Sequence, residues 1–189
     1  MKKIFLLLVL FLGFHSAWAD VVEVDGIFYN LNRKDKTASV TYKGSYYDLY
    51  DEYSGEIVIP ETVIVDGIRY SVTSLGEYCF GGCSSLTSIT IPNSVTSLGY
   101  SCFRDCSSLE RIEVDAANSV YDSRENCNAI IHTSTNELVV GCKNSKIPNF
   151  VTSLGDDCFS GCSSLTSITI PNSVTSLGVD CFYKCSSLE

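Results

Sequence analysis

An internal repeat constrains this sequence more than any other feature. The segment GCSSLTSITIPNSVTSLG at 82–99 recurs without a change at 161–178. A looser unit surrounds both copies, and 23 positions separate Cys79 from Cys102, Cys158 from Cys181 and Pro148 from Pro171. A fixed period of about 20–50 residues is the signature of a solenoid, in which each unit stacks on the next. Function must therefore be sought along a stacked array.

Two units are longer than the others. The intervals are 32 positions from Pro60 to Pro92 and 33 positions from Asp115 to Pro148. We infer insertions near 63–71 and 116–141. The Asp66-Gly67 pair in the first insertion predicts a small hairpin, since Asp-Gly favours the tight turns that join antiparallel strands.

The second insertion predicts another hairpin, because apolar residues flank a polar turn at 133–136. Pairing Ile130 with Val139 would set Cys127 directly opposite Cys142. Opposite strand positions bring Cβ atoms within about 4.5–5.5 Å, which small shifts could close to bonding distance. A disulfide between these two cysteines and a pair of free thiols both fit this register.

Residues 86–92, LTSITIP, indicate how one unit folds. Leu86, Ile89 and Ile91 follow the L-x-x-L-x-L pattern of leucine-rich repeats, and the two isoleucines point inward at the period of a strand. Pro92 ends the strand because it cannot donate the next ladder hydrogen bond. The predicted fold class is an α/β leucine-rich-repeat solenoid that is mostly β: a parallel strand ladder whose CFxxC segments close each unit in a short helical turn.

The chain divides into three predicted parts. Residues 1–19 have a basic start, an 11-residue apolar run and an A-x-A site, which predict a signal peptide cleaved after Ala19 and a secreted or cell-surface protein. Residues 20–54 do not match the repeat and predict an N-terminal β cap with a hairpin. Residues 55–189 predict about five units. The last unit is truncated, so we expect either a longer protein or some other cover for the open edge.

Five tyrosines crowd the end of the predicted cap. Two interpretations stay open for this cluster, packing of the cap and binding of a partner. Its members are Tyr42, Tyr46, Tyr47, Tyr50 and Tyr53.

Charge excludes several classes of partner. The whole chain has a net charge of −9, and loss of the leader would leave 11 basic against 22 acidic residues. An acidic exported chain repels nucleic acid and anionic lipid, so we expect no nucleic-acid partner and no membrane insertion. The sequence does not fix the oligomeric state.

Catalysis is not expected either. His132 is the only histidine beyond the leader, and no phosphate loop or hydrolase motif occurs, so we predict a non-enzymatic protein without a cofactor. The four C-x3-C segments match neither a zinc site nor a C-x-x-C redox motif. Buried free thiols, disulfides within a turn or between stacked units, and a metal all remain open, with no metal ligand predicted.

The outward residues of the strand face form the candidate binding site, because solenoids bind partners along such concave surfaces. Aligning the units gives Glu56, Val58, Thr87, Ser88, Thr90, Glu110, Arg111, Glu113, Lys143, Asn144, Lys146, Thr166, Ser167 and Thr169. The same alignment sets Glu110 beside Lys143 and Glu113 beside Lys146. These charges either bind a ligand or neutralise one another across strands.

The CSSLTSITIPNSVTSLG core resembles the BspA-like branch of the leucine-rich-repeat family, and the resemblance covers about 57–189. The insertion at 121–144 looks like a variant repeat of that family, and 20–53 is less specifically similar to its N-terminal caps. The family typically has Ala where this chain has Cys79, Cys102, Cys158 and Cys181.

The resemblance implies an exported or surface-attached protein of host-associated anaerobic bacteria, several of which are described as adhesins. We therefore expect an extracellular binding module for host or cell-surface proteins or glycans. The alternative is a structural spacer or stalk that presents another domain beyond residue 189. The third hypothesis is that the protein is an enzyme.

Overall fold

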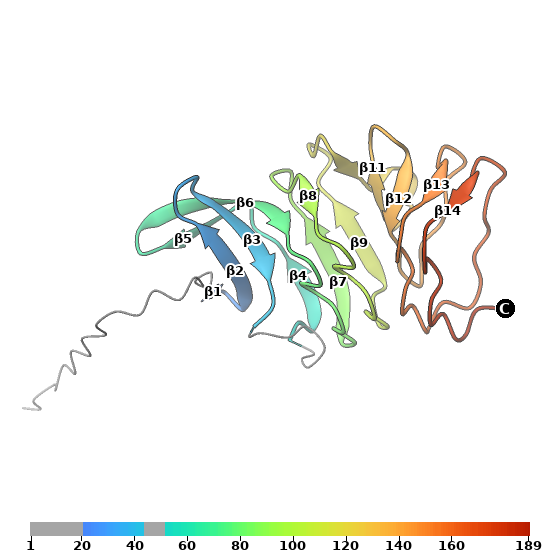
Figure 1. The fold of residues 1–189 in the computed structure, drawn as a ribbon, viewed down its shortest axis with the longest axis horizontal. Helices are drawn as coiled ribbons and strands as arrows, with labels where there is room; N and C mark the ends of the chain where they lie inside the picture. The colour runs from blue at the N-terminus through green and yellow to red at the C-terminus, as the bar shows by residue number, and fades with distance from the viewer. Residues whose placement is uncertain (1–20, 44–51) are drawn as a thin grey trace, which may run out of the picture.

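Short strands joined by tight turns form nearly all the regular structure of the computed structural model, which describes residues 21–43 and 52–189 (Figure 1). The predicted signal peptide and Tyr46, Tyr47 and Tyr50 lie outside the described residues. Within them the one helical element is the three-residue 3-10 turn η2 (Arg124–Asn126). The prediction of a mostly β chain is confirmed.

The strands form three sheets. The first has the order β1 (Val21–Val24), β2 (Ile27–Asn32), β3 (Thr37–Thr41), β6 (Ile68–Leu75) and β5 (Thr62–Val65), with β8 (Ser97–Leu98) also on β6. The second is the parallel sheet β4 (Gly55–Val58), β7 (Leu86–Ile91) and β9 (Arg111–Val114). The third contains β10 (Tyr121–Asp122), β11 (Ile130–His132), β12 (Glu137–Val140), β13 (Ser153–Leu154) and β14 (Ser176–Leu177).

The predicted hairpins form. Strands β5 and β6 pair antiparallel around Asp66 and Gly67, whose φ angles of 52° and 74° suit the left-handed turn expected of Asp-Gly. Strands β2 and β3 pair around the polar turn after Asn32. Five short strands were not predicted: β1 before the first hairpin, β10 before the second, and the two-residue strands β8, β13 and β14.

The four CFxxC turns (79–83, 102–106, 158–162 and 181–185) stack on one another. Phe80 N–H donates to Cys102 O at 2.9 Å, and Phe159 N–H donates to Cys181 O at 2.8 Å. The second and third turns are also in direct contact, because Asp105 N–H donates to Ser160 O at 3.1 Å. The second and third turns therefore stack directly, although the second insertion lies between them in the sequence.

These segments are turns and not helical, so that part of the predicted fold class is wrong. The residue before each first cysteine and the residue before each second cysteine lie in the left-handed region. In the first turn these are Tyr78 and Gly82, with φ angles of 52° and 75°. Only three residues separate the two positions, which is too few for a turn of α-helix.

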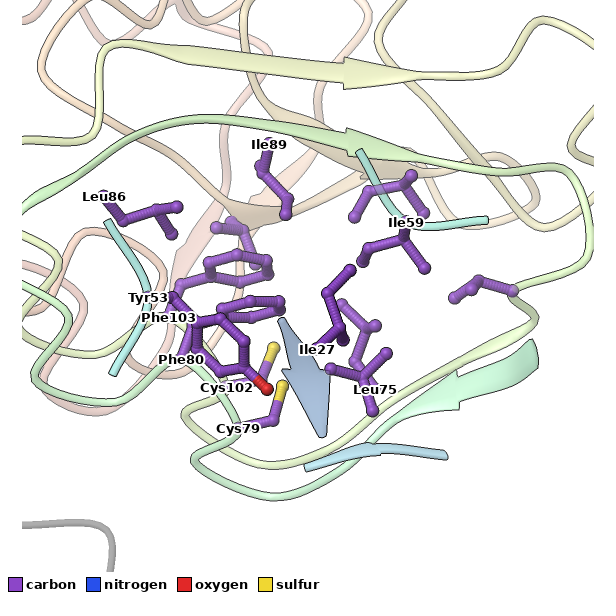
Figure 2. Packing of buried hydrophobic residues seen from close by; sticks show 14 of the residues in the cluster. Ile27, Tyr53, Ile59, Leu75, Cys79, Phe80, Leu86, Ile89, Cys102 and Phe103 are labelled. Carbon is purple, nitrogen blue, oxygen red and sulfur yellow. The ribbon is translucent and has the colours of Figure 1, made fainter. Parts of the chain in front are cut away.

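Aromatic rings stack along the turns, as the repeat period predicts. The ring centroids of Phe80 and Phe103 are 5.0 Å apart, and those of Phe159 and Phe182 are 5.3 Å apart. Tyr53 packs on Phe80 at 4.8 Å, as Figure 2 shows, and its hydroxyl donates to Thr41 O. Tyr53 thus joins the first sheet to the stacked turns, and for this tyrosine the packing interpretation is confirmed.

Candidate binding face

The outer face of the β4–β7–β9 sheet carries the first half of the predicted site. Ile89 and Ile112 point into the core and are buried, so the alternate residues face outward. The parallel pairing sets the outward residues in rows, Glu56 with Ser88 and Arg111, then Val58 with Thr90 and Glu113. Glu110 N–H donates to Thr87 O at 2.9 Å and places Glu110 beside that threonine.

Ser88 differs from its prediction as an exposed residue. It is 7% exposed, whereas Thr87 and Thr90 are half-buried. Glu56 and Arg111 are the residues paired with Ser88 on the two neighbouring strands, and their longer side chains flank its small hydroxymethyl group. Ser88 is therefore not available as a contact residue.

The charged residues of the face pair with one another. Lys143 Nζ lies 2.5 Å from Glu110 Oε1, which confirms the predicted neighbours. Glu113 instead pairs within its own strand, because Arg111 Nη2 lies 2.5 Å from Glu113 Oε2. Among the described residues no ion pair joins Glu113 to Lys146. All four paired side chains are partly exposed, so each pair contributes about 0–1 kcal/mol.

The strand ladder ends at β9, where the prediction of further strands is wrong. Asn128 lies along the free edge of β9: its Oδ1 accepts from Ile112 N–H at 2.7 Å, and its Nδ2 donates to Glu110 O at 2.5 Å. Ser123 Oγ accepts from Val114 N–H at 3.0 Å. Side chains of the second insertion thus take hydrogen bonds that a next strand would take.

The remaining predicted site residues lie past this break, in segments that are not strands. Lys143 is half-buried, whereas the others are exposed: Asn144, Lys146, Thr166, Ser167 and Thr169. The structure therefore brings together the outward residues of β4, β7 and β9 with Lys143 and with Asn144, whose Nδ2 donates to Glu110 O at 3.4 Å. It leaves Lys146, Thr166, Ser167 and Thr169 outside that sheet.

A hollow of about 690 Å³ opens where the ladder ends. One wall is the edge of β9 with Asp115 and Ala116, and the other is formed by Ser123, Asn126 and Asn128 of the second insertion. The sequence-based site contained only the β9 wall. The insertion wall could have been suspected from the extra length of this unit, but its residue types gave no signal.

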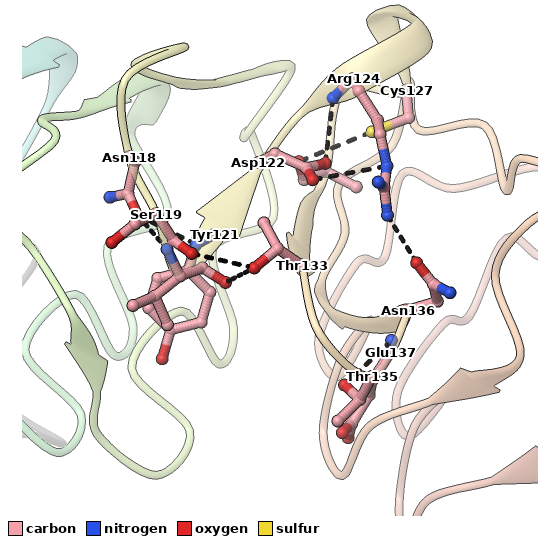
Figure 3. A network of polar contacts seen from close by, with 12 residues as sticks. Asn118, Ser119, Tyr121, Asp122, Arg124, Cys127, Thr133, Thr135, Asn136 and Glu137 are labelled. Carbon is pink, nitrogen blue, oxygen red and sulfur yellow. Dashed lines mark hydrogen bonds and ion pairs between the residues drawn. The ribbon is translucent and has the colours of Figure 1, made fainter.

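Polar contacts fix the insertion in place (Figure 3). Buried Asn118 makes four hydrogen bonds: Nδ2 donates to Pro92 O and Val95 O, and Oδ1 accepts from Val120 N–H and Tyr121 N–H. The Arg124 guanidinium lies 3.4 Å from Asp122 and 4.0 Å from the centre of the Phe150 ring. The insertion wall of the hollow is therefore anchored to the units on both sides.

Cys127 and Cys142 are free thiols in the structure. The predicted hairpin register holds for Ile131 with Leu138 and for His132 with Glu137, but it does not continue to the two cysteines. A bulge after Ile130 pairs that residue with Val140 instead of Val139. Asn128 Nδ2 donates to Cys142 Sγ at 3.3 Å, so the amide lies beside this sulfur.

In the structure all ten cysteines are free and nine are buried, which is the arrangement that the buried-thiol interpretation expects. Burial disfavours the thiolate because a charge is poorly solvated inside the protein. It raises the pKa of Cys102 to about 12 and, as the largest of several causes, that of Cys162 to about 12 and that of Cys127 to about 11.

Neither a catalytic group nor a metal site emerges from the described residues. His132 Nδ1 lies 3.2 Å from Thr135 Oγ1 and 3.3 Å from Ser134 Oγ, all at an exposed hairpin tip. No group of three or more His, Cys, Asp or Glu side chains within 21–43 and 52–189 is placed to hold a metal. The same residues contain no helix long and apolar enough to cross a membrane.

Parallel strands on one side and stacked turns on another are the arrangement of leucine-rich-repeat proteins. The family model described as BspA type leucine rich repeat region, in six copies, matches residues 63–139 and 139–189. The chain therefore belongs to the BspA-type leucine-rich-repeat family. Among curated proteins none matches it.

Several solved structures are similar to this chain. A leucine-rich repeat protein from Bacteroides ovatus is 28% identical with a TM-score of 0.55, and the match covers 89% of this chain and 40% of that one. A leucine rich repeat protein of T. pallidum is 24% identical with a TM-score of 0.49, covering 88% and 68%. A leucine rich cell surface protein from Faecalibacterium prausnitzii is 24% identical with a TM-score of 0.42, covering 89% and 53%. This chain thus spans less than half of the Bacteroides ovatus protein.

Proposed function

We propose that this chain is a non-enzymatic extracellular binding module that recognises a protein or glycan surface. In this proposal the units form a solenoid, β1–β3 cap its N-terminal end, and the outer face of the β4–β7–β9 sheet is its concave side. The observation that carries the proposal is the 690 Å³ hollow at the edge of β9, since it joins the sheet face to a wall from the insertion.

The chemistry of the hollow favours a polar partner. Arg111 supplies donors, Glu113 and Asp115 supply acceptors, and Asn126 supplies both. All four residues are exposed. Protein surfaces and glycans present mixed donors and acceptors of this kind. A net charge of −9 disfavours nucleic acid and anionic membranes as partners.

Binding by many weak contacts suits this surface. The exposed ion pairs make small contributions to folding, so their side chains can be redirected to a partner at little cost. Few aromatic anchors lie on the face, and each contact is therefore expected to be weak unless several act together.

A binding panel tests the proposal. The purified chain is immobilised and exposed to extracellular matrix proteins, mucin and a glycan array, and each positive is repeated with Arg111→Glu. Arg69→Glu is the matched control, because Arg69 is an exposed arginine on β6. We expect Arg111→Glu to weaken binding at least about tenfold, while the control binds like the parent.

Two outcomes would overturn the proposal. If Arg111→Glu and Arg69→Glu changed binding equally, the contact with the partner would lie away from the hollow. Absence of binding across the panel would favour the alternative, a structural spacer that presents another domain.

A further inference from the structure

The second and third CFxxC turns are joined less completely than the other stacked turns. Three backbone hydrogen bonds of 2.8–3.1 Å join the first turn to the second, donated from positions 78, 80 and 82, and three join the third to the fourth, donated from 157, 159 and 161. Of the equivalent set between the second and third turns, the described residues form only the bond from Asp105 N–H to Ser160 O. Gly141 N–H of the second insertion donates to Cys158 O at 2.7 Å, in the place that Phe103 N–H would take. The two turns therefore meet at one end and are open at the other.

A pocket of about 230 Å³ lies at the open end. Residues 98–104 line it from the second turn, residues 155–158 line it from the third, and Glu137 with residues 139–141 line it from the insertion. Asp157 reaches across from the third turn, because its Oδ2 accepts a hydrogen bond from Ser101 Oγ. The carboxylate of Asp157 thus lies in the space between the two turns.

The third turn supplies hydrogen-bond acceptors to this pocket. Asp157 is 8% exposed, and its other carboxylate oxygen, Oδ1, has no hydrogen-bond partner in the described part of the chain. Ser160 is 2% exposed, and its Oγ is also without a partner there. Asp156 and Glu137 line the same pocket and add negative charge. Because a buried charged oxygen without a donor is unfavourable, this wall favours a ligand that brings a positively charged donor.

The second turn supplies hydrogen-bond donors to the same pocket. Ser101 N–H and Phe103 N–H have no acceptor among the residues that the structure describes, whereas the equivalent N–H groups of the first turn are bonded. Arg104 carries the one positive charge among the lining residues. Its other contacts are long, with Nε 3.9 Å from Asp105 Oδ2 and the guanidinium 5.2 Å from the centre of the Tyr183 ring. This wall therefore favours an anionic group on the ligand.

We propose that this pocket binds a small free α-amino acid. The α-ammonium group of the amino acid donates to Asp157 Oδ1 and Ser160 Oγ. Its α-carboxylate accepts from the N–H groups of Ser101 and Phe103, beside the positive charge of Arg104. A zwitterion fits because donors and acceptors lie on opposite walls, whereas an amine or a carboxylate alone leaves one wall unpaired. The pocket shares no lining residue with the hollow beside β9, so this site is separate from the one in the proposed function.

Calorimetric titration of the whole chain near neutral pH tests the proposal, with L-alanine as the probe. We expect saturable binding with a Kd below about 1 mM. Ethylamine lacks the α-carboxylate of L-alanine, and propionate lacks its ammonium group. Each of these two compounds should bind at least about tenfold more weakly than L-alanine, because each leaves one wall of the pocket without its charged partner.

A pair of matched variants tests the acceptor wall. Asp157→Asn removes the charge but keeps an oxygen that can accept from Ser101, and asparagine tolerates the φ angle of 53° at this position. It should weaken the binding of L-alanine at least about tenfold. Asp180→Asn is the control, because Asp180 holds the same position in the last turn with a φ angle of 55°, is exposed and does not line the pocket. This control should bind L-alanine like the parent chain.

The proposal fails on any of three results. If L-alanine does not saturate the chain by about 10 mM, the pocket holds water and no amino acid. If ethylamine or propionate binds as tightly as L-alanine, the pocket recognises a single charge and not a zwitterion. If Asp157→Asn and Asp180→Asn weaken binding equally, L-alanine binds elsewhere on the chain. The comparison of the three probes on the parent chain decides the question even if a variant folds poorly.

Discussion

Asn118 is the residue whose replacement should most damage the anchoring of the second insertion. Its amide is 7% exposed and makes four hydrogen bonds, two to the carbonyls of Pro92 and Val95 and two from the N–H groups of Val120 and Tyr121. Every donor and acceptor of the amide faces the protein. Asn118→Ala removes all four bonds and leaves two N–H groups and two carbonyls without their partner.

The magnitude follows from these bonds. Each contributes about 0.5–1.5 kcal/mol net, and a buried group that stays unpaired costs about 1–3 kcal/mol. Some of the freed groups will reach water at the surface of the insertion, so we expect a total loss of about 3 kcal/mol. With a urea dependence of about 2 kcal/mol per molar, the unfolding midpoint should fall by about 1.5 M.

Urea unfolding followed by far-ultraviolet circular dichroism measures this loss. Asn172→Ala is the matched control, because Asn172 is exposed and makes no side-chain hydrogen bond among the described residues. Its effect should stay within about 0.5 kcal/mol. A loss below about 1 kcal/mol for Asn118→Ala would refute the reasoning, since it would mean that the four bonds do not tie the insertion to the preceding unit.

Two further predictions concern packing and pH. Gly141→Ala should destabilise the chain by about 1–3 kcal/mol in the same urea assay, because a Cβ there would lie 2.1 Å from the ring of buried Phe159; an unchanged midpoint would contradict this. The contribution of the buried thiols to the free energy of unfolding should be fully present below pH 9.0 and be lost as pH rises toward 12. Burial raises the pKa of Cys102 and Cys162 to about 12, so the same thiols ionise first in the unfolded chain. Ionisation of each unfolded thiol lowers the free energy of unfolding by about 1.4 kcal/mol per pH unit. In unfolding experiments under dithiothreitol between pH 9.0 and 12, the free energy of unfolding of Cys102→Ala should therefore fall less steeply with pH than that of the parent chain.

Features with a local cause could be predicted from the sequence. The turn at Asp66 and Gly67 forms because both residue types tolerate the left-handed region, and this preference can be read from two letters. The Phe80–Phe103 stack follows from the repeat period, which places equivalent residues on top of one another. The first prediction needed only two adjacent residues, and the second needed only the repeat period.

Features that depend on backbone context could not be predicted. Tyr78 and Ser101 adopt left-handed φ angles of 52° and 48°, although neither residue type favours that region, and these angles turn the expected helices into tight turns. The bulge after Ile130 likewise shifts the register by one residue without any signal in the hairpin sequence. In both cases the packing of neighbouring units determines the conformation.

The candidate site shows the same limit most clearly. The β9 wall could be predicted because Arg111 and Glu113 alternate with buried residues along a strand. The opposite wall depends on Asn128, whose amide satisfies the strand edge at a distance of 16 residues along the chain. A single polar residue in a long insertion gives no indication of which backbone groups it will pair with.

The two identical segments have different surroundings in the structure. Ser88 and Ser167 occupy the same place in the same sequence, yet Ser88 is buried between Glu56 and Arg111 while Ser167 is exposed. The surface of a unit is therefore determined by its neighbours more than by its own residues. It follows that a partner cannot be selected by the repeated segments alone. Under the proposed function, selectivity for a partner must come from the residues that interrupt the repeat, and in this chain they converge on the hollow beside β9.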